Sequence, residues 1–314
     1  MQVINIAQYE NKGPVVAALG NFDGVHRGHQ SLLMETVRLA RVLHATPIVY
    51  TFSTHPANVL AGRIVAPSIT TNEERLELFG QHGIEMTVMD PFNPETAHLA
   101  PDSFVEHLLS EKLHCVGVVC GFHYHFGSHG AGDAALMQML CTELGMTASI
   151  MPPVLQDGRV ISSTWIRECV VTGNVGKADE LMGHPYMLRA IVVPGQHLGT
   201  RLGIPTMNQW FPEEKLQPAR GVYCTEVIVD GVTYTGATNV GTRPTVSGKG
   251  VNAETHLIGF TGNLYGRELE IRFLRKIRDE RKFENIEALR IQLEKDVARC
   301  ASLAKKGVDS RAGL

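Results

Sequence analysis

The sequence predicts an α/β protein, in which a doubly wound, mainly parallel sheet is followed by a small antiparallel β-barrel and a C-terminal helix. From about residue 14 to residue 154, short apolar runs alternate with amphipathic stretches, which indicates βαβ crossovers and a sheet covered on both faces. From Gly221 onward, β-rich runs are separated by Gly and Pro turns, as is typical of a small barrel. The 314 residues are enough for two domains of ordinary size.

In the first domain we expect strand and helix to alternate along the chain. The expected strands are 15–19, 47–52, 85–90, 116–122 and 147–154, and the expected helices are 29–45, 70–83, 102–113 and 132–145. Thr71 with Glu74 three residues later is a capping-box signature for the second of these helices. In such folds ligands bind at the carboxyl ends of the strands, near the switch in strand order.

Two short helices, 165–173 and 175–183, are expected next, and they end where Gly183 and Pro185 break the pattern. We therefore place the first domain at 1–183, the second at 184–305 and a frayed tail at 306–314.

The second domain begins its β-rich part with two runs joined by Asp230-Gly231, a strong hairpin signal. A second hairpin is expected around Gly262 and Asn263. The last helix has Asn285 as its cap and an apolar stripe at helical spacing, formed by Ile286, Leu289, Leu293 and Val297.

The composition limits the class of protein. The formal net charge of −3 gives no general attraction to nucleic acid or acidic membranes. No apolar run approaches the roughly 20 residues that span a bilayer, and the N-terminus lacks the pattern of a secretory signal. We therefore expect a protein that binds neither nucleic acid nor membrane. The six cysteines form no C-x-x-C pair, so we expect buried, reduced thiols in a cytoplasmic protein.

The stretch "GNFDGVHRGH" (Gly20 to His29) follows the first long strand, at the carboxyl edge of the sheet. A glycine-containing turn lets the backbone approach a ligand closely, and the following helix presents free N–H groups to an anion. His26 and His29 add hydrogen-bond donors or positive charge at the first helical turn. Together these features suit a nucleotide phosphate.

Two alternatives remain open for this stretch. The histidines could be polar residues on a solvated turn, or they could belong to a zinc site. Zinc would need further ligands, for which His123, His125 and His129 are candidates.

A second motif, "ISSTWIR" (Ile161 to Arg167), follows the last strand of the first domain. Its Ser and Thr residues could cap a helix that directs Arg167 toward phosphates. With H-x-G-H in the same domain, it resembles the two-part signature of the nucleotidylyltransferase superfamily, whose members transfer AMP from ATP by direct in-line attack. Such enzymes position their substrates and stabilise charge, which explains the lack of a Ser/His/Asp arrangement in this region.

The whole chain resembles the prokaryotic bifunctional riboflavin kinase/FAD synthetase family, from about Val15 to Val297. The N-terminal matches are "GNFDGVHRGH", "TFSTHP", "ITTNEERLELF" and "ISSTWIR". The C-terminal matches are "LGIPTMN", "ARGVY", "NVGTRPT", "AETHL" and "GNLYGREL". Their order and spacing together are highly specific.

The resemblance implies an FMN adenylyltransferase in the first domain. His26, His29 and Arg167 would be catalytic, with the histidines stabilising the α-phosphate transition state. His55 and Pro56 would lie near the nucleotide pocket, and His123 and His125 fall where the flavin is held. The residues implied to bind the nucleotide are Gly20, Phe22, Asp23, Gly28, Ser163 and Thr164.

The resemblance also implies a riboflavin kinase in the second domain. Thr206 and Asn208 would bind Mg²⁺ with the nucleotide, because a hydroxyl and an amide carbonyl are hard oxygen ligands. The loop from Gly199 to Gly203 would cover the phosphates. Glu254 would be the general base for the ribityl hydroxyl, although on residue pattern alone it could be a solvent-facing strand residue.

The chain departs from the family pattern in the segment "GFHYHFG". There, Asn or Asp usually stands at position 123, and a residue such as Arg or Thr at position 125. Milder departures are Ser53-Thr54 for Glu-Pro, Met207 for Ala and Ile204 for Phe.

The implied function is the conversion of riboflavin and ATP to FMN and ADP, followed by the conversion of FMN and ATP to FAD and pyrophosphate. An alternative, suggested by His123 and His125, is an active kinase with a weakened or altered adenylyltransferase. A third hypothesis is a flavin- or nucleotide-sensing protein without turnover, against which the intact H-x-G-H, PTMN and Glu254 argue.

Overall fold

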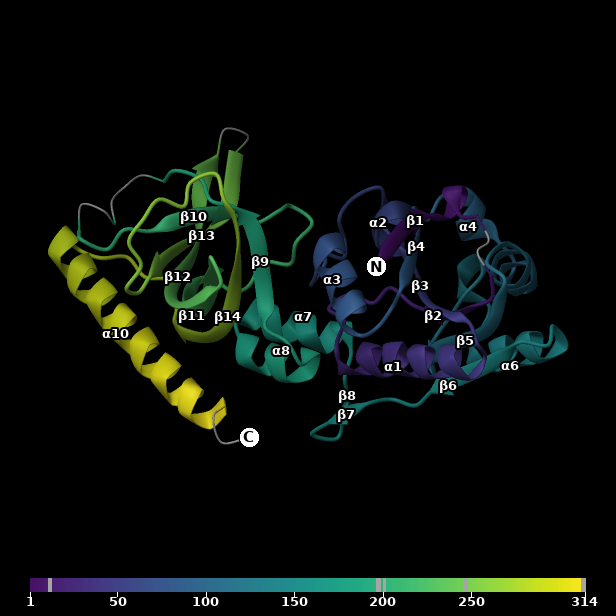
Figure 1. The fold of residues 1–314 in the computed structure, drawn as a ribbon. Coiled ribbons are helices and arrows are strands. Elements are labelled where there is room, and N and C mark those ends of the chain that lie inside the picture. The colour runs from purple at the N-terminus through teal and green to yellow at the C-terminus, as the bar shows by residue number, and fades with distance from the viewer. Residues whose placement is uncertain (11–12, 196–198, 200–201, 246–247, 312–314) are drawn as a thin grey trace. The chain divides into compact units, whose positions relative to one another are not determined.

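The computed structural model describes residues 1–10, 13–195, 199, 202–245 and 248–311 (Figure 1). The chain divides into two compact units, Met1–Ser163 and Thr164–Leu314, and each unit is described by itself.

The first unit is built on a six-stranded sheet in the order β1-β4-β3-β2-β5-β6, in which every pairing is parallel. From β2 the chain continues to β3 and β4 on one side and later to β5 and β6 on the other, so the strand order reverses at β2. The predicted doubly wound fold is confirmed, and residues 20–29 lie at the switch point. The strands are β1 (Gln2–Asn5), β2 (Val15–Leu19), β3 (Thr46–Phe52), β4 (Met86–Asp90), β5 (Cys115–Gly121) and β6 (Thr147–Met151).

Strand β2 shows why the apolar runs form this sheet. All five of its residues are buried. Val15, Ala17 and Leu19 pack into the core on one face, and Val16 and Ala18 pack into the core on the other. Because side chains alternate along a strand, a continuous apolar run fits only a strand that is covered on both sides.

The helices of the first unit cover both faces of the sheet. Leu33 of α1 and Phe79 of α3 lie in one core, and Phe104 and Met137 lie in the other. The predicted capping box on Thr71 is present. The helices are α1 (Arg27–Val42), α2 (Pro56–Ala61), α3 (Asn72–Gln81), α4 (Pro94–His98), α5 (Pro101–Ser103) and α6 (Ala134–Glu143). Shorter or irregular elements are the 3-10 turns η1 (Ile6–Gln8) and η3 (Ser128–Gly130), the π-helical stretch η2 (Phe104–Lys112), and the hairpin of β7 (Leu155–Gln156) and β8 (Arg159–Val160).

The second unit is a barrel of six antiparallel strands in the order β10-β13-β12-β11-β14-β9. A bridge between Val193 and Asn208 joins its two edges, so the barrel is nearly closed. The hairpin at Asp230-Gly231 is confirmed, with both residues at positive φ. The strands are β9 (Tyr186–Ile191), β10 (Met207–Trp210), β11 (Gly221–Val229), β12 (Val232–Thr245), β13 (Gly248–Leu257) and β14 (Glu268–Arg278).

The second predicted hairpin is wrong. β13 pairs with β12 and β10, whereas β14 pairs with β11 and β9, so the two strands flanking Gly262 and Asn263 are not neighbours. The Gly and Asn turn signals belong instead to a connection that crosses from one part of the barrel to another.

Helices α7 (Ser163–Thr172) and α8 (Val175–Met182) were both predicted. α8 packs on β14 and β9, and the compact units divide between Ser163 and Thr164 rather than at Gly183. The division of functional domains at Gly183 stays a prediction.

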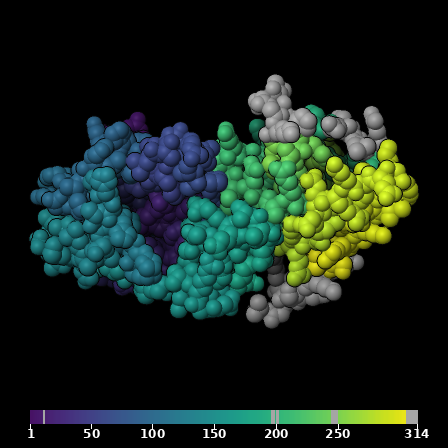
Figure 2. Space-filling model, turned by 180° about the vertical axis from the view of Figure 1, so that it is seen from behind, coloured from purple at the N-terminus to yellow at the C-terminus, as the bar shows by residue number. Residues whose placement is uncertain are grey.

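The last helix, α10 (Ile286–Arg311), packs along β11 and β12 on one side of the barrel (Figure 2). The amide N–H of Ala288 donates to the Asn285 side chain at 2.8 Å, which confirms the predicted cap. The helix runs to Arg311 and so includes most of the predicted tail, while 312–314 lie outside the described residues.

All six cysteines are buried thiols, as predicted. Among the described residues, no helix is long and apolar enough to cross a membrane.

Candidate functional site

The turn after β2 has an unusual backbone. Phe22, Gly24 and Val25 have φ angles of 52°, 82° and 34°. Only glycine adopts such angles easily, and a β-branched valine rarely does. Phe22 and Val25 are fully buried, so packing holds the strained turn in place. Backbone strain of this kind is concentrated at functional sites.

The two predicted histidines form one structural unit at the start of α1. The Nδ1 atom of His26 accepts the amide N–H of His29 at 3.2 Å, so His26 is the N-cap of the helix. The two rings are stacked, with centroids 3.6 Å apart. A Cβ added at Gly28 would lie 3.1 Å from the His26 ring, which explains the glycine between them.

His29 has an open hydrogen-bonding position. Its Nδ1 atom is buried and has no hydrogen-bond partner among the described residues. Burial lowers the pKa of His29 well below its ordinary range, and charge on His26 and Arg75 lowers it further. Without a bound anion, His29 is therefore a neutral imidazole near pH 7.

Asp23 is buried and holds a neighbouring loop. Its Oδ1 atom accepts the amide N–H groups of Ile69 at 2.8 Å and Thr70 at 3.1 Å. The Thr70 hydroxyl in turn accepts the amide N–H of Gly24 at 2.9 Å. Asp23 thus fixes the loop before α3 against the turn, and its implied contact with phosphates stays a prediction.

The first residue of α7 joins the two predicted motifs. The Ser163 hydroxyl donates to the carbonyl oxygen of Asp23 at 2.9 Å, so the start of "STWIR" contacts the "GNFDG" turn. Thr164 and Arg167 lie farther along α7, within the second compact unit. Their implied roles at the first site stay predictions, as does that of Gly20.

Arg75 is a site residue that the sequence analysis missed. It is buried on α3, and its guanidinium donates to the carbonyl oxygens of Asn21 and Phe52, at the ends of β2 and β3. It therefore ties together two strand ends at the switch point. Helical periodicity could not have found it, because a charged residue in an amphipathic helix is normally exposed.

His123 and His125 are exposed on the turn after β5. The ring centroids of His123 and Phe122 are 3.5 Å apart, and His125 Nδ1 lies 3.2 Å from the Gly130 carbonyl oxygen. Within the described ranges, no three His, Cys, Asp or Glu side chains are grouped closely enough to hold a metal, so the zinc alternative gains no support there.

In the second unit, the strand register gathers the predicted kinase residues. Glu254 on β13 lies opposite Asn208 on β10 and opposite Asn239 on β12. Directly opposed residues of antiparallel strands share one face of the sheet. The structure therefore brings the predicted base and a predicted metal ligand together.

Glu254 is held by two neighbours. Arg243 Nε lies 3.0 Å from Glu254 Oε1, and Arg243 Nη2 lies 3.4 Å from Oε2. Asn252 Nδ2 also donates to Glu254 Oε1, at 3.4 Å. Asn252 was not predicted, because its position two residues before Glu254 on an alternating strand does not reveal its burial.

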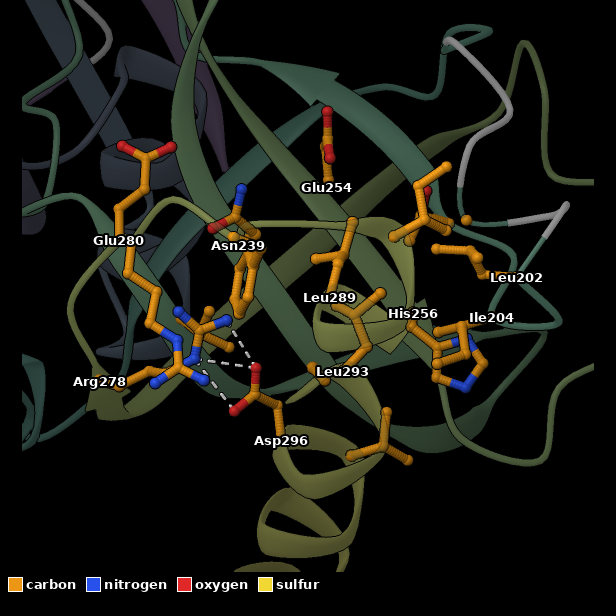
Figure 3. A pocket seen from close by; sticks show the side chains of 18 of the residues that line it. Leu202, Ile204, Asn239, Glu254, His256, Arg278, Glu280, Leu289, Leu293 and Asp296 are labelled. Carbon is orange, nitrogen blue, oxygen red and sulfur yellow. Dashed lines mark hydrogen bonds and ion pairs between the residues drawn. The ribbon is translucent and has the colours of Figure 1, made fainter. Parts of the chain in front are cut away.

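Glu254 lies in the wall of a cavity of about 920 Å³ between the barrel and α10 (Figure 3). Leu289 and Leu293, from the predicted apolar stripe of α10, form part of its surface and are only partly buried. The other side of the wall is polar and contains Asn239 and Arg243. A concave site in which apolar side chains face a group of polar ones can hold a small molecule that has an apolar and a polar part.

An ion pair fixes α10 at this cavity. Arg278, at the end of β14, donates from Nη2 and Nε to Oδ2 of Asp296 at 2.7 and 2.9 Å. Asp296 is buried, and Gln292 donates to its Oδ1 at 2.6 Å. The dashed contacts in Figure 3 show the Arg278–Asp296 part of this arrangement.

Thr206 lines both this cavity and a smaller one of about 400 Å³. The smaller cavity has an apolar wall formed by Val192, Leu257, Phe260, Leu264 and Tyr265. The predicted metal ligand Thr206 therefore borders both cavities.

The predicted phosphate loop is described at Gly199 and from residue 202 onward; 200 and 201 lie outside the described residues. The Gly199 carbonyl accepts the amide N–H of Ile204 at 2.8 Å, and Gly203 has a φ of 75°. Gly199 also lines the larger cavity, beside Thr206. Gly199 and Ile204 are therefore held together next to the predicted metal ligand.

Comparisons with known proteins agree with both halves of the chain. A family model described as FAD synthetase matches residues 8–165, and one described as riboflavin kinase matches residues 182–304. The curated bifunctional riboflavin kinase/FMN adenylyltransferases of Pseudomonas fluorescens and Bacillus subtilis are 33% and 34% identical to the chain. The first match covers 94% of this chain and of its relative, and the second covers 91% and 92%.

A solved structure from Streptococcus pneumoniae, named as a macrolide-efflux protein, matches with a TM-score of 0.85 at 28% identity. The match covers 95% of this chain and 98% of that one. Its name points to a different activity, but likeness of fold does not carry an activity. The sequence relatives, which match over nearly the whole length, decide the family.

The two domain matches, the paired histidines at the switch point and the cavity around Glu254 lead to one conclusion. The chain belongs to the bifunctional riboflavin kinase/FMN adenylyltransferase family, and it is an ATP-dependent enzyme with a kinase and a nucleotidyltransferase domain.

Proposed function

We propose that the second domain uses ATP and Mg²⁺ to phosphorylate riboflavin, and that the first domain then transfers AMP from a second ATP to the resulting FMN. The products are ADP from the first step, and pyrophosphate and FAD from the second. The register of Glu254 with Asn208, beside the larger cavity, is the single observation that most supports the kinase assignment. The six buried thiols favour the reducing cytoplasm as the location.

Glu254 is the general base of the kinase. Its carboxylate takes the proton of the ribityl hydroxyl, whose oxygen attacks the γ-phosphorus of ATP. The bond from the γ-phosphorus to its bridging oxygen breaks, and ADP leaves with the electron pair. The position of Glu254 in the cavity wall supports this role, because a base must come within hydrogen-bond reach of the proton that it takes.

Thr206 and Asn208 hold the metal ion. ATP-using enzymes of this kind generally need a divalent metal, and a hydroxyl with an amide carbonyl suits Mg²⁺, which also takes phosphate oxygens as ligands. Once bound, Mg²⁺ neutralises charge on the phosphates. Gly199, which is bonded to Ile204 and lines the larger cavity with Thr206, can approach them through its backbone.

The larger cavity takes riboflavin, and the smaller one takes the adenine base. This assignment rests on Glu254, which lines the larger of the two cavities and not the smaller one. Because the base must face the acceptor hydroxyl, the acceptor belongs in the larger cavity. Thr206 borders both, which suits a metal ligand between acceptor and donor.

In the first domain, a phosphate oxygen of FMN attacks the α-phosphorus of ATP, and pyrophosphate leaves. His26, His29 and the amide groups at the start of α1 stabilise the charge that develops. An anion beside His29 favours its protonated form, so the buried Nδ1 becomes a donor when the nucleotide binds. His123 and His125, exposed after β5, are proposed contacts of the flavin.

A time course with riboflavin, ATP and Mg²⁺ tests this function, with the flavins separated by chromatography. We expect FMN to rise first and FAD to follow. FMN without FAD would favour the alternative of a weakened adenylyltransferase, and binding without either product would favour a sensing protein.

A further inference from the structure

Asn252 links the two groups on which the proposed kinase chemistry depends. It is almost fully buried on β13. Its Nδ2 atom donates to Oδ1 of Asn208 at 3.2 Å and to Oε1 of Glu254 at 3.4 Å. One amide nitrogen therefore joins the proposed metal ligand to the proposed base.

Only an amide with this orientation suits the position. Both partners of Nδ2 are acceptor oxygens, so turning the amide over would set its own oxygen against them. A serine could offer one proton, which serves one partner. An aspartate of the same shape would offer none at neutral pH.

The remaining oxygen of the amide supports a role other than stability. Oδ1 of Asn252 is buried and has no hydrogen-bond partner among the described residues. A buried acceptor left without a partner destabilises a fold. The side chain is therefore better explained by what its nitrogen holds in place.

We propose that Asn252 is a positioning residue for phosphoryl transfer, which sets the metal-binding carbonyl of Asn208 and the carboxylate of Glu254 relative to each other. The inference rests on the proposed roles of Asn208 and Glu254. The bond to Asn208 Oδ1 uses one lone pair of that oxygen and leaves the other for the metal. The bond to Glu254 is a second contact on Oε1, which also accepts from Arg243 Nε, so Oε2, with the longer contact to Arg243 Nη2 alone, is the oxygen that takes the proton.

Gln209 offers a matched control on the neighbouring strand. It is fully buried, and its Nε2 bridges the carbonyl oxygens of Ala190 and Leu269 at 2.6 and 2.7 Å. Its Oε1 is also buried without a partner in the described part of the chain. Gln209 follows Asn208 on β10, and successive side chains of a strand point to opposite faces of the sheet. Gln209→Ala therefore removes a buried amide bridge of the same kind from the face that does not carry Asn208 and Glu254.

The experiment compares Asn252→Ala, Asn252→Asp, Asn252→Ser and Gln209→Ala in the full-length enzyme. We expect Asn252→Ala and Asn252→Asp to lower kcat for FMN formation about 10- to 100-fold, with a raised Mg²⁺ requirement and a nearly unchanged KM for riboflavin. Asn252→Ser, with one donor, should recover part of the loss. Gln209→Ala should lower Tm without changing these kinetic values.

Calorimetric titration of ADP gives a readout that is independent of turnover. The Asn252 variants should bind ADP more weakly than wild type when Mg²⁺ is present and equally well when it is chelated. The inference is overturned if Asn252→Ala and Asn252→Asp keep kcat and Mg²⁺-dependent ADP affinity within about twofold of wild type. It is also overturned if Gln209→Ala loses both to the same extent, because the loss is then structural.

Failure of the proposed function gives a different pattern. If Glu254→Gln keeps forming FMN, the base assignment is wrong, and the ADP titration still decides whether Asn252 acts through Asn208. If Glu254→Gln is inactive and the Asn252 variants are silent in both assays, the base stands and the positioning role does not.

Discussion

The guanidinium of Arg243 is paired with the carboxylate of Glu254, with Nε 3.0 Å from Oε1, in the wall of the larger cavity. Both side chains are partly exposed, so the pair adds little to stability, and its main effect is to orient the carboxylate. A planar guanidinium that contacts both carboxylate oxygens restricts their rotation more than an ammonium can.

We therefore expect Arg243→Ala to lower kcat for FMN formation about tenfold, since a positioned base contributes roughly 10²–10⁴ to the rate and loses part of that when it turns. The kcat of Arg243→Lys for FMN formation should lie between those of wild type and Arg243→Ala. Steady-state kinetics of both activities checks this. An equal loss of FMN and FAD formation would point to a general defect instead.

Glu254→Gln should reduce FMN formation by about 10²-fold or more, because the amide keeps the size of the side chain but cannot take a proton. FAD formation from supplied FMN should continue, because Glu254 belongs to the second unit. Flavin products are measured by chromatography with riboflavin and FMN in separate reactions. Undiminished FMN formation would show that another group is the base.

Gly28→Ala should lower FAD formation and spare FMN formation. The added Cβ would lie 3.1 Å from the His26 ring, so the ring has to shift by a few tenths of an ångström, which disturbs its N-cap bond and its stack on His29. Loss of such a cap costs about 1 kcal/mol in stability, which is smaller than the expected effect on the reaction. Gly121→Ala is the control, because a Cβ at Gly121 meets nothing within 4 Å, and it should leave FAD formation unchanged. Gly145 is unsuitable as a control because its φ is positive. Equal FAD formation by Gly28→Ala and wild type would count against the histidine pair.

His29 should make the stability of the protein dependent on pH. Because its folded pKa is lowered, the folded state binds fewer protons than the unfolded state. The neutral ring's contribution is therefore complete above the unfolded pKa of about 6.5 and is lost as the pH falls toward the folded pKa. Relative to His29→Gln, the wild type should lose up to about 1.4 kcal/mol of unfolding free energy per pH unit in that window. Urea unfolding from pH 8 to pH 5 measures this difference, and parallel curves for the two proteins would contradict it.

The parts of the fold that the sequence predicted depend on local pattern. β2 could be found because burial on both faces requires a continuous apolar run. α3 could be found because its capping box involves only residues three apart in the sequence, Thr71 and Glu74. β1 was missed because it lies at the sheet edge with mostly exposed side chains. The pairing of β13 and β14 was wrong because turn signals describe the local chain and not which distant strands meet.

The site shows the same limit. The stacking of His26 on His29 follows from their spacing at a helix start, and these residues were predicted. Arg75 and Asn252 were not, because a polar residue in an amphipathic pattern is assigned to solvent, and only the tertiary structure reveals that both are buried. Their partners lie on other elements, at Asn21 after β2, Phe52 on β3 and Asn208 on β10, which periodicity cannot connect.

The Arg278–Asp296 pair should affect riboflavin binding through α10. Arg278→Ala leaves a buried carboxylate without its partner, which destabilises a protein by about 3–5 kcal/mol, whereas removing both charges destabilises it less. Because Leu289 and Leu293 of the same helix line the larger cavity, the single variant should raise the KM for riboflavin more than the KM for ATP. Arg278→Ala with Asp296→Ala should recover part of both losses. Thermal unfolding and kinetics with each substrate varied separately test this. If the double variant is less stable than the single one, or if the KM for ATP rises instead, the pair does not hold α10 at the larger cavity as we expect.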